Sequence, residues 1–364
     1  MTPVRESMLL LVTAALLGAC GDDGTRAVHA HADAGACVHC ARDAAVEHDA
    51  APEAGPVDAA TDAGADAWAP PEVTFPAQDS TEPFLLSQTG LYRDIERKVV
   101  APDLIAYEPK YKLWSDAAQK QRWLRLPPGT TIDTSDMDHW RFPVGTMLFK
   151  QFSLDGKRLE TRIVARIGPG ERDYFMGAFI WNDDESDAMF APDGASNVRG
   201  TPHDVPTTKN CLTCHDGDAG RVLGFSAVQQ PDAPPELLSD PPIIPYRVPG
   251  NATTSAALGY LHANCGHCHN EDGAARPDTD MVLRLSVGAK APEETDTYKT
   301  TLGVAMQYFE GSPLTLRVDP GQADQSGVFF RMSQRGPKTQ MPPLATEIVD
   351  DDGIASVRAW IESL

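Results

Sequence analysis

Residues 253–269 read Thr-Thr-Ser-Ala-Ala-Leu-Gly-Tyr-Leu-His-Ala-Asn-Cys-Gly-His-Cys-His. Polar residues at 253–255 are candidate N-caps, and apolar residues follow at helical spacing, at Ala257, Leu258, Leu261 and Cys265. The stretch therefore predicts an amphipathic helix that runs directly into the motif Cys265-Gly266-His267-Cys268-His269.

A second copy of this motif, Cys211-Leu212-Thr213-Cys214-His215, lies about 50 residues earlier in the chain. The pattern C-x-x-C-H is the attachment motif of c-type haem. Two thiols one short turn apart add to the two vinyl groups of haem, and the imidazole that follows binds the iron. The sequence therefore predicts two covalently bound haems, held by Cys211, Cys214, His215, Cys265, Cys268 and His269, with His215 and His269 as iron ligands.

Three other uses of paired cysteines fit less well. A four-cysteine zinc site needs neither adjacent histidine, and its pairs normally lie roughly 15 to 20 residues apart. A thioredoxin-like dithiol needs a βαβ context, which neither motif has. A structural disulfide pair leaves both histidines unexplained.

A cytochrome-like domain is expected at residues 248–364. Met341 precedes Pro342, which favours an extended loop that can aim the thioether at the second iron, with Met332 as the alternative ligand. A C-terminal amphipathic helix follows Asp350. This order of motifs resembles class I cytochrome c and implies an all-α domain. Alternating residues at 281–286 and 314–318 add a small predicted β insertion.

Residues 73–247 are predicted to form a β-rich, sandwich-like domain that ends in the first haem motif, with an antiparallel half-barrel as the alternative. Residues 159–167 alternate between apolar and polar, and further strands are expected near 123–126, 145–154 and 174–181. The distal ligand of the first haem is left open, with His203 preferred over Met189 and Met176. A five-coordinate iron would permit chemistry on small ligands.

The N-terminus is expected to export and anchor the chain. Residues 1–20 have a short apolar run and end in Leu17-Gly18-Ala19-Cys20, which resembles a bacterial lipobox with Cys20 as the lipidated residue. Residues 21–72 contain 11 acidic and 2 basic residues and are predicted to be a disordered, Ala/Asp-rich tether. The expected location is a bacterial membrane surface that faces the periplasm or the cell exterior.

The formal net charge of −21 argues against nucleic acids as partners. Redox partner proteins with a basic docking patch are expected instead. No nucleotide-binding loop and no hydrolase motif occurs in the sequence.

The chain resembles a family of bacterial dihaem c-type cytochromes, many of them lipoproteins. The resemblance covers roughly residues 80–364, and rests on the two haem motifs, Met341-Pro342-Pro343-Leu344, Leu113-Trp114-Ser115-Asp116, Phe142-Pro143-Val144-Gly145-Thr146, Glu160-Thr161-Arg162 and Trp181-Asn182. It implies a membrane-tethered carrier of single electrons. The alternatives are a peroxidase-like dihaem oxidoreductase, with an open first haem and substrate bound by the β-rich domain, and a binding module in which the haems are passengers.

Overall fold

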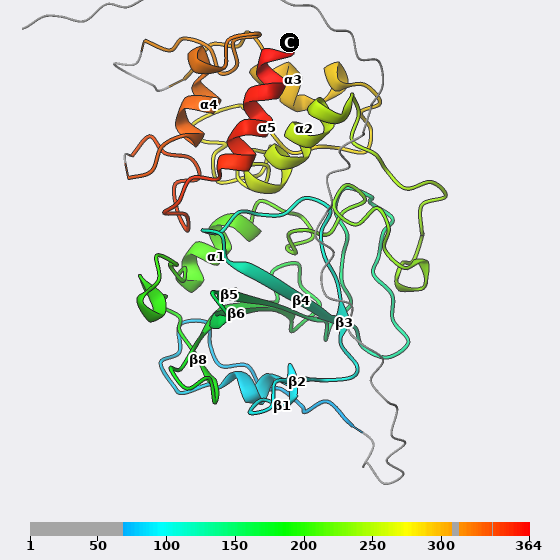
Figure 1. The fold of residues 1–364 in the computed structure, drawn as a ribbon. Coiled ribbons are helices and arrows are strands. Elements are labelled where there is room, and N and C mark those ends of the chain that lie inside the picture. The colour runs from blue at the N-terminus through cyan, green and yellow to red at the C-terminus, as the bar shows by residue number, and fades with distance from the viewer. Residues whose placement is uncertain (1–67, 308–312, 337) are drawn as a thin grey trace, which may run out of the picture. The chain divides into compact units, whose positions relative to one another are not determined.

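The alternating sequence between residues 119 and 181 forms the centre of an antiparallel sheet in the computed structural model, which describes residues 68–307, 313–336 and 338–364. Six strands follow one another in sequence order, each hydrogen-bonded to the next (Figure 1). They are β3 (Ile105–Ala106), β4 (Gln119–Arg125), β5 (Met147–Leu154), β6 (Lys157–Arg166), β7 (Tyr174–Trp181) and β8 (Ala188–Phe190). A separate two-stranded ribbon consists of β1 (Tyr92–Asp94) and β2 (Val99–Val100).

The two faces of this sheet differ in what covers them. One face is apolar, and its buried core includes Trp123, Phe149, Ile163, Phe175 and Phe179. The other face joins a second core made with Phe225 and Leu238, and it also carries buried charged side chains. Because side chains alternate along a strand, the same strands supply an apolar core on one side and a partly polar wall on the other.

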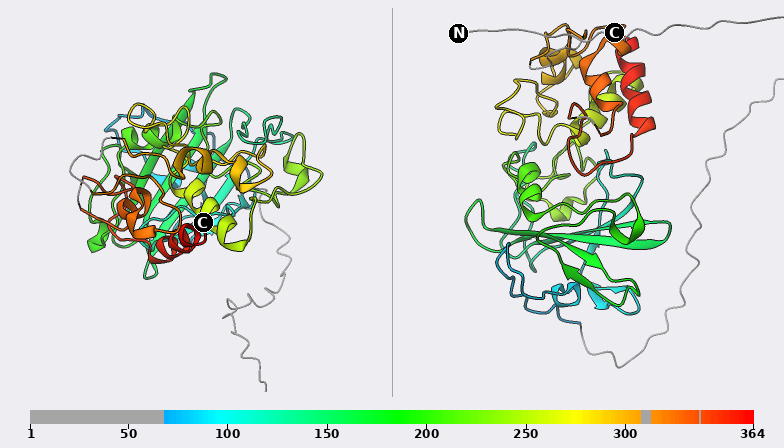
Figure 2. Two further views of the ribbon diagram at one scale, coloured as in Figure 1. Left: turned by 90° about the horizontal axis from the view of Figure 1, so that it is seen from above. Right: turned by 90° about the vertical axis from the view of Figure 1, so that its left-hand side faces the viewer.

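The α-helices of the described residues all follow the last sheet strand, β8, in the sequence. They are α1 (Thr208–His215), α2 (Ala252–Asn264), α3 (Asp296–Thr301), α4 (Gly327–Met332) and α5 (Asp351–Glu362). Short 3₁₀ turns occur at Leu86–Thr89, Val198–Gly200, Pro235–Leu237, Pro292–Glu294 and Ala323–Gln325. In the front view of Figure 1 and the side view of Figure 2, α2 to α5 lie on one side of the sheet. On the same side, α1 lies next to the sheet.

The predicted fold class is wrong for residues 248–364, which do not form an all-α cytochrome domain. Only α2 and α5 exceed two turns, α3 and α4 have six residues each, and irregular chain connects them. The predicted sandwich is wrong too, since the described strands form one six-stranded sheet and a two-stranded ribbon. The helices predicted at 253–265 and 350–364 are present as α2 and α5. The residues between them do not form a helical domain.

The predicted β insertion is also wrong. Residues 281–286 are not in a strand, and the segment 314–318 makes only isolated bridges, for example between Leu316 and Ala305. The Leu283 N–H donates to the carbonyl of His269 (2.8 Å), and the Leu285 N–H donates to Nδ1 of His262 (3.0 Å). The alternation therefore reflects a segment hydrogen-bonded to the second Cys-x-x-Cys-His motif and the end of α2, with its leucines in the core.

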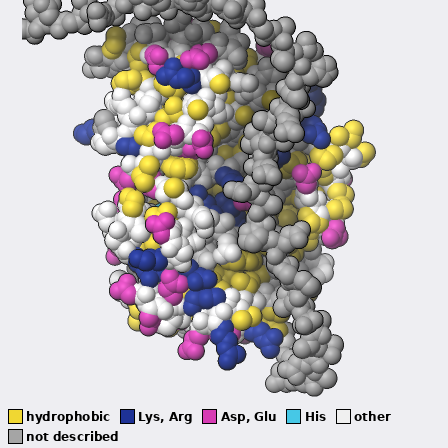
Figure 3. Space-filling view, viewed as in Figure 1, with side chains coloured by type: hydrophobic (Ala, Val, Ile, Leu, Met, Phe, Trp, Pro, Cys, Tyr) yellow, Lys and Arg dark blue, Asp and Glu magenta, His cyan; other side chains and the backbone are white. Residues whose placement is uncertain are grey.

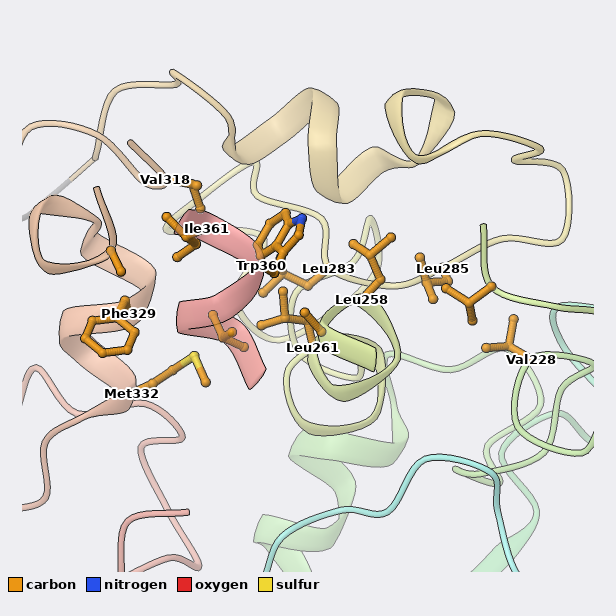
Figure 4. Packing of buried hydrophobic residues seen from close by; sticks show 14 residues of the cluster. Val228, Leu258, Leu261, Leu283, Leu285, Val318, Phe329, Met332, Trp360 and Ile361 are labelled. Atoms are coloured by element: carbon orange, nitrogen blue, oxygen red, sulfur yellow. The ribbon is translucent and has the colours of Figure 1, made fainter. Parts of the chain in front are cut away.

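The core between α2 and α5 is built around Trp360 (Figure 4). Leu258 and Leu261 of α2 meet Trp360 and Ile361 of α5, and all four side chains are fully buried. Each helix begins at a side-chain cap, with Asn251 accepting from the N–H of Thr254 and Asp350 from that of Gly353.

Gly259 allows a close approach at α2, where the neighbour is Tyr111. A Cβ at this position would lie 2.0 Å from Cε1 of Tyr111, a residue that precedes the sheet strand β4. The aromatic ring therefore rests on the helix backbone and connects α2 to the sheet-forming part of the chain.

The expected signal peptide, Cys20 and the tether as far as residue 67 lie outside the described residues. In the part of the chain that the structure describes, no helix has the length and apolar character needed to cross a bilayer. Ala63–Leu364 clusters as one unit by its internal contacts, and the expected boundary near residue 247 stays a prediction.

We predict that Gly259→Ala lowers the free energy of unfolding by about 1–3 kcal/mol, because the new methyl group collides with the Tyr111 ring. This loss exceeds the gain of up to about 1 kcal/mol from the better helix propensity of alanine. Urea unfolding measures the difference, with Thr253→Ala on the exposed side of α2 as the control. Tyr111→Ala should remove most of the effect of Gly259→Ala, and an additive double variant would contradict the contact.

Candidate functional site

Both Cys-x-x-Cys-His motifs line one cavity of about 650 Å³. The two motifs lie about 50 residues apart in the sequence, which gives no sign that they share one cavity. Leu148 and Val164 of the sheet, residues of α1 and α2, and the loop around Met341 complete the wall. The volume lies within the range of roughly 300–1,000 Å³ that is typical of ligand and cofactor sites.

The two motifs approach each other at their glycines. A Cβ on Gly217, two residues after His215, would lie 2.8 Å from Cα of Gly273 and 2.8 Å from the carbonyl oxygen of His267. Only glycine allows backbones to come this close. The first motif itself lies on α1, which starts where the Thr207 side chain accepts a hydrogen bond from the N–H of Asn210 (3.1 Å).

A hydrogen bond to the backbone fixes the tautomer of His215. Its Nδ1 donates a hydrogen bond to the carbonyl of Arg221 (2.7 Å), which leaves Nε2 as the unprotonated nitrogen. Burial lowers the pKa of His215 to about 4, so the ring is neutral at pH 7. A neutral imidazole with a fixed tautomer is the form that binds a metal.

His269 differs from His215 in its hydrogen bonds. Its Nδ1 is buried and has no partner within hydrogen-bond geometry. Burial lowers its pKa to about 4 as well. By contrast, the nearby His262 uses Nδ1 to accept from Leu285, which places its proton on Nε2 and leaves no free lone pair for a metal. Of these two cavity-lining histidines, His269 is therefore the one with an unsatisfied ring nitrogen.

The four motif cysteines are unpaired thiols that line the cavity. Burial raises the pKa of Cys211 to about 11 and of Cys265 to about 12, so both thiols stay protonated at neutral pH. The absence of a disulfide within either pair leaves both sulfur atoms free for thioether bonds. Free thiols and two neutral histidines on the wall of one cavity fit the residue chemistry that c-type haem attachment needs.

A smaller metal site must be weighed against haem here. Ligand atoms of Cys214, His267 and Cys268 all lie within 4.8 Å of one another, which suits a zinc ion in part. Such a site would leave Cys211, Cys265 and both motif histidines without a role. The cluster is better explained as the meeting point of two attachment motifs.

Met341 and Met332 both line the cavity, so the structure keeps both candidates for the second iron. The Met341 N–H donates to the carbonyl of Arg331 (2.9 Å), which fastens the loop to the end of α4. The predicted alternatives for the first iron behave differently. Met176 is buried in a sheet core, and Met189 is half exposed; neither lines the cavity.

One segment, Leu113–Asp116, holds the walls of the cavity together. The Asn264 side-chain oxygen accepts from the N–H of Trp114 (2.7 Å), and the Trp114 indole donates to the carbonyl of Ile348 (2.9 Å). One oxygen of Asp116 accepts from the N–H groups of Glu347 and Ile348, both at 2.8 Å. This clamp ties the end of α2 to the loop that follows Met341.

His203 lies outside the cavity lining. It is buried, and its Nε2 donates to Glu160 at 2.7 Å, while Arg162 forms a bidentate pair with the same carboxylate. Burial alone would raise the pKa of Glu160, but Arg162 and His203 outweigh it and hold the pKa at about 2. The ring is thus engaged in a buried ion cluster, and we do not carry His203 forward as an iron ligand.

The charged part of the cavity wall was missed by sequence reasoning. The alternating sequence of β6 places Glu160 and Arg162 on the face opposite to Ile163 and Ala165. Charged residues on such a face are normally exposed to water. Here Glu160 is fully buried and Arg162 faces the cavity. The sequence signal that could have found them is the Glu160-Thr161-Arg162 stretch together with Arg122 and Lys150 on the two preceding strands.

No protein-family model, curated protein or solved structure matches this chain.

We predict that Glu160→Gln lowers the free energy of unfolding at pH 7 by about 3 kcal/mol, because Arg162 loses its buried carboxylate. The folded-state pKa of Glu160 is depressed, so its contribution is present above about pH 4.5 and is lost as the pH falls towards 2. Urea unfolding at several pH values tests this, with the exposed Glu171→Gln as control. Equal acid sensitivity of the parent and of the Glu160→Gln variant would contradict the assignment.

Proposed function

We propose that the chain is a dihaem c-type cytochrome that transfers single electrons between redox partner proteins outside the cytoplasmic membrane. The observation that carries the proposal is the shared cavity, into which both C-x-x-C-H motifs and Met341 face. Covalently bound haem supplies reversible one-electron Fe(III)/Fe(II) chemistry.

The protein's own residues hold and enclose the cofactors. Cys211 and Cys214 from α1, and Cys265 and Cys268 after α2, provide the thioether sulfurs. His215 is oriented by the Arg221 carbonyl, and the clamp of Leu113–Asp116 keeps the Met341 loop against the end of α2. Ligands held in place by hydrogen bonds and packing favour electron transfer, because the protein then rearranges little when the iron changes its oxidation state.

A second candidate is a haem oxidoreductase with an open coordination position at the first motif. The observation in its favour is that His203 lies outside the cavity and is engaged by Glu160. An open iron beside the sheet would allow a small substrate to bind there. The two functions differ in whether the native protein binds carbon monoxide.

Partner proteins are expected to approach by electrostatic attraction between unlike charges. Acidic and basic side chains are interspersed over the described part of the face in Figure 3. This face therefore provides no single-sign docking patch, and we assign no docking site on it. Lipid attachment at Cys20 and a location at a bacterial membrane remain part of the proposal.

We predict two covalent haems per chain when the protein is matured by a c-type haem attachment system. Cys211→Ala/Cys214→Ala and Cys265→Ala/Cys268→Ala should each leave one haem, because each pair serves one cofactor. Intact mass and the pyridine haemochrome spectrum give the count. The control is Cys37→Ala/Cys40→Ala, a pair with the same spacing that is followed by Ala41 instead of histidine, and it should retain both haems. A parent protein with zinc but no haem would refute the proposal.

We predict that Met341→Ala creates a new carbon monoxide site in the reduced protein and lowers one reduction potential. Loss of a thioether ligand should reduce the equilibrium constant for reduction at least tenfold, about 59 mV for one electron. Met332→Leu is the matched control, since this residue lines the same cavity. If Met332→Leu gains the carbon monoxide site and Met341→Ala does not, Met332 is the ligand. Carbon monoxide binding by the unaltered protein would favour the oxidoreductase.

A further inference from the structure

Three cations stand directly opposite one another across the middle of the sheet. Arg122 of β4 pairs with Lys150 of β5, and Lys150 pairs with Arg162 of β6. All three side chains line the cavity that contains the haem motifs. Like charges at directly opposite positions destabilise a sheet, so this cationic row (Arg122, Lys150 and Arg162) requires compensation by anions.

The protein supplies only part of that compensation. Arg162 has the buried carboxylate of Glu160, at 2.6 Å, and Arg122 has Glu108 at 3.9 Å, where the carboxylate is half exposed. Among the residues that the structure describes, Lys150 forms no ion pair within 4.0 Å, and its Nζ lies 4.9 Å from the centre of the Phe152 ring. The middle basic side chain of the row, Lys150, therefore has no carboxylate partner among the described residues.

The surroundings of Lys150 are cationic as well as buried. The charged groups that act on it are Arg162, Arg122, Lys120 and Glu160, and it acts in turn on His215. Burial, followed by the three neighbouring cations, lowers the pKa of Lys150 well below its usual value. A carboxylate placed beside this amine would restore its charged form and remove most of the repulsion in the row.

Apolar residues adjoin the cationic row on the same face of the sheet. The next set of opposed residues is Leu124, Leu148 and Val164, and the last two also line the cavity. The wall is thus apolar along one part and cationic along the next. A ligand that matches it must be largely apolar and must carry carboxylates at one edge, as haem does.

We propose that the cationic row binds the carboxylates of the haem attached at Cys211 and Cys214, with Lys150 as the main partner. The inference rests on the proposed function, since it requires that haem. It gives the sheet a specific task, which is to neutralise the acidic edge of the cofactor in the cavity. The same row would raise the reduction potential of the first haem, because positive side chains stabilise the electron that reduction adds.

The test uses the haem-loaded protein and the variants Lys150→Gln, Lys150→Arg and Arg122→Gln. The surface variant Lys157→Gln is the control, because it removes the same charge from an exposed position of β6. Potentials are measured by spectroelectrochemical titration between pH 5.5 and 8.5. The wave that disappears in Cys211→Ala/Cys214→Ala identifies the first haem.

We expect Lys150→Gln to reduce the equilibrium constant for reduction of the first haem about tenfold at pH 8, which is about 59 mV. Its potential should also become dependent on pH, because an unpaired carboxylate takes up a proton on reduction. Arg122→Gln should give a smaller shift in the same direction. Lys150→Arg and Lys157→Gln should leave the potential and its pH profile as in the parent.

Other results would overturn the inference. One such result is that Lys150→Gln and Arg122→Gln carry two haems and still show the same potentials as the control Lys157→Gln. That result would exclude the carboxylate contact and leave the proposed function intact. A potential in the parent that shifts with added inorganic phosphate, and no longer does so in Lys150→Gln, would show that the row takes a free anion. New carbon monoxide binding by Lys150→Gln would make the amine an iron ligand instead. A parent without two haems refutes the proposed function itself.

Discussion

The close meeting of the two Cys-x-x-Cys-His segments is the constraint on which the rest of this structure depends. Gly217 fits against Gly273 and the carbonyl of His267 with no space for a side chain. This contact turns two separate attachment motifs into two walls of one cavity. The sheet and the Met341 loop then have to enclose that cavity from the remaining sides, which explains why they lie against the motifs.

The residues outside the motifs are best understood as supports for this arrangement. Tyr111 rests on α2 at Gly259, and Trp114 and Asp116 hold the end of α2 and residues 347–348. A short segment before β4 therefore links the sheet to both the second motif and the methionine loop. In the sequence, Leu113–Asp116 contributes only to the family resemblance, and its hydrogen bonds give it a structural role.

Local patterns in the sequence predicted local structure well. The strands at 147–154, 157–166 and 174–181 and the two long helices lie where periodicity placed them, since each buries one face. The fold class expected for residues 248–364 was wrong, and so was the β insertion within them. The apolar alternation at Leu283 and Leu285 comes from hydrogen bonds to His269 and His262 and not from a paired strand. Contacts between residues far apart in the chain, such as Glu160 with His203, leave no periodic signal and could not be predicted.

The Gly217 contact also bears on the order of events during biogenesis. The two motifs are separated by about 50 residues, so their contact is non-local and forms only once the chain has closed on itself. Closure brings all four thiols, each partly buried, to the wall of one cavity. Under the proposed function, haem attachment would therefore be easiest before this closure, while the two motifs are still apart. Each half of the chain supplies walls of the same cavity, so neither half could form that cavity alone.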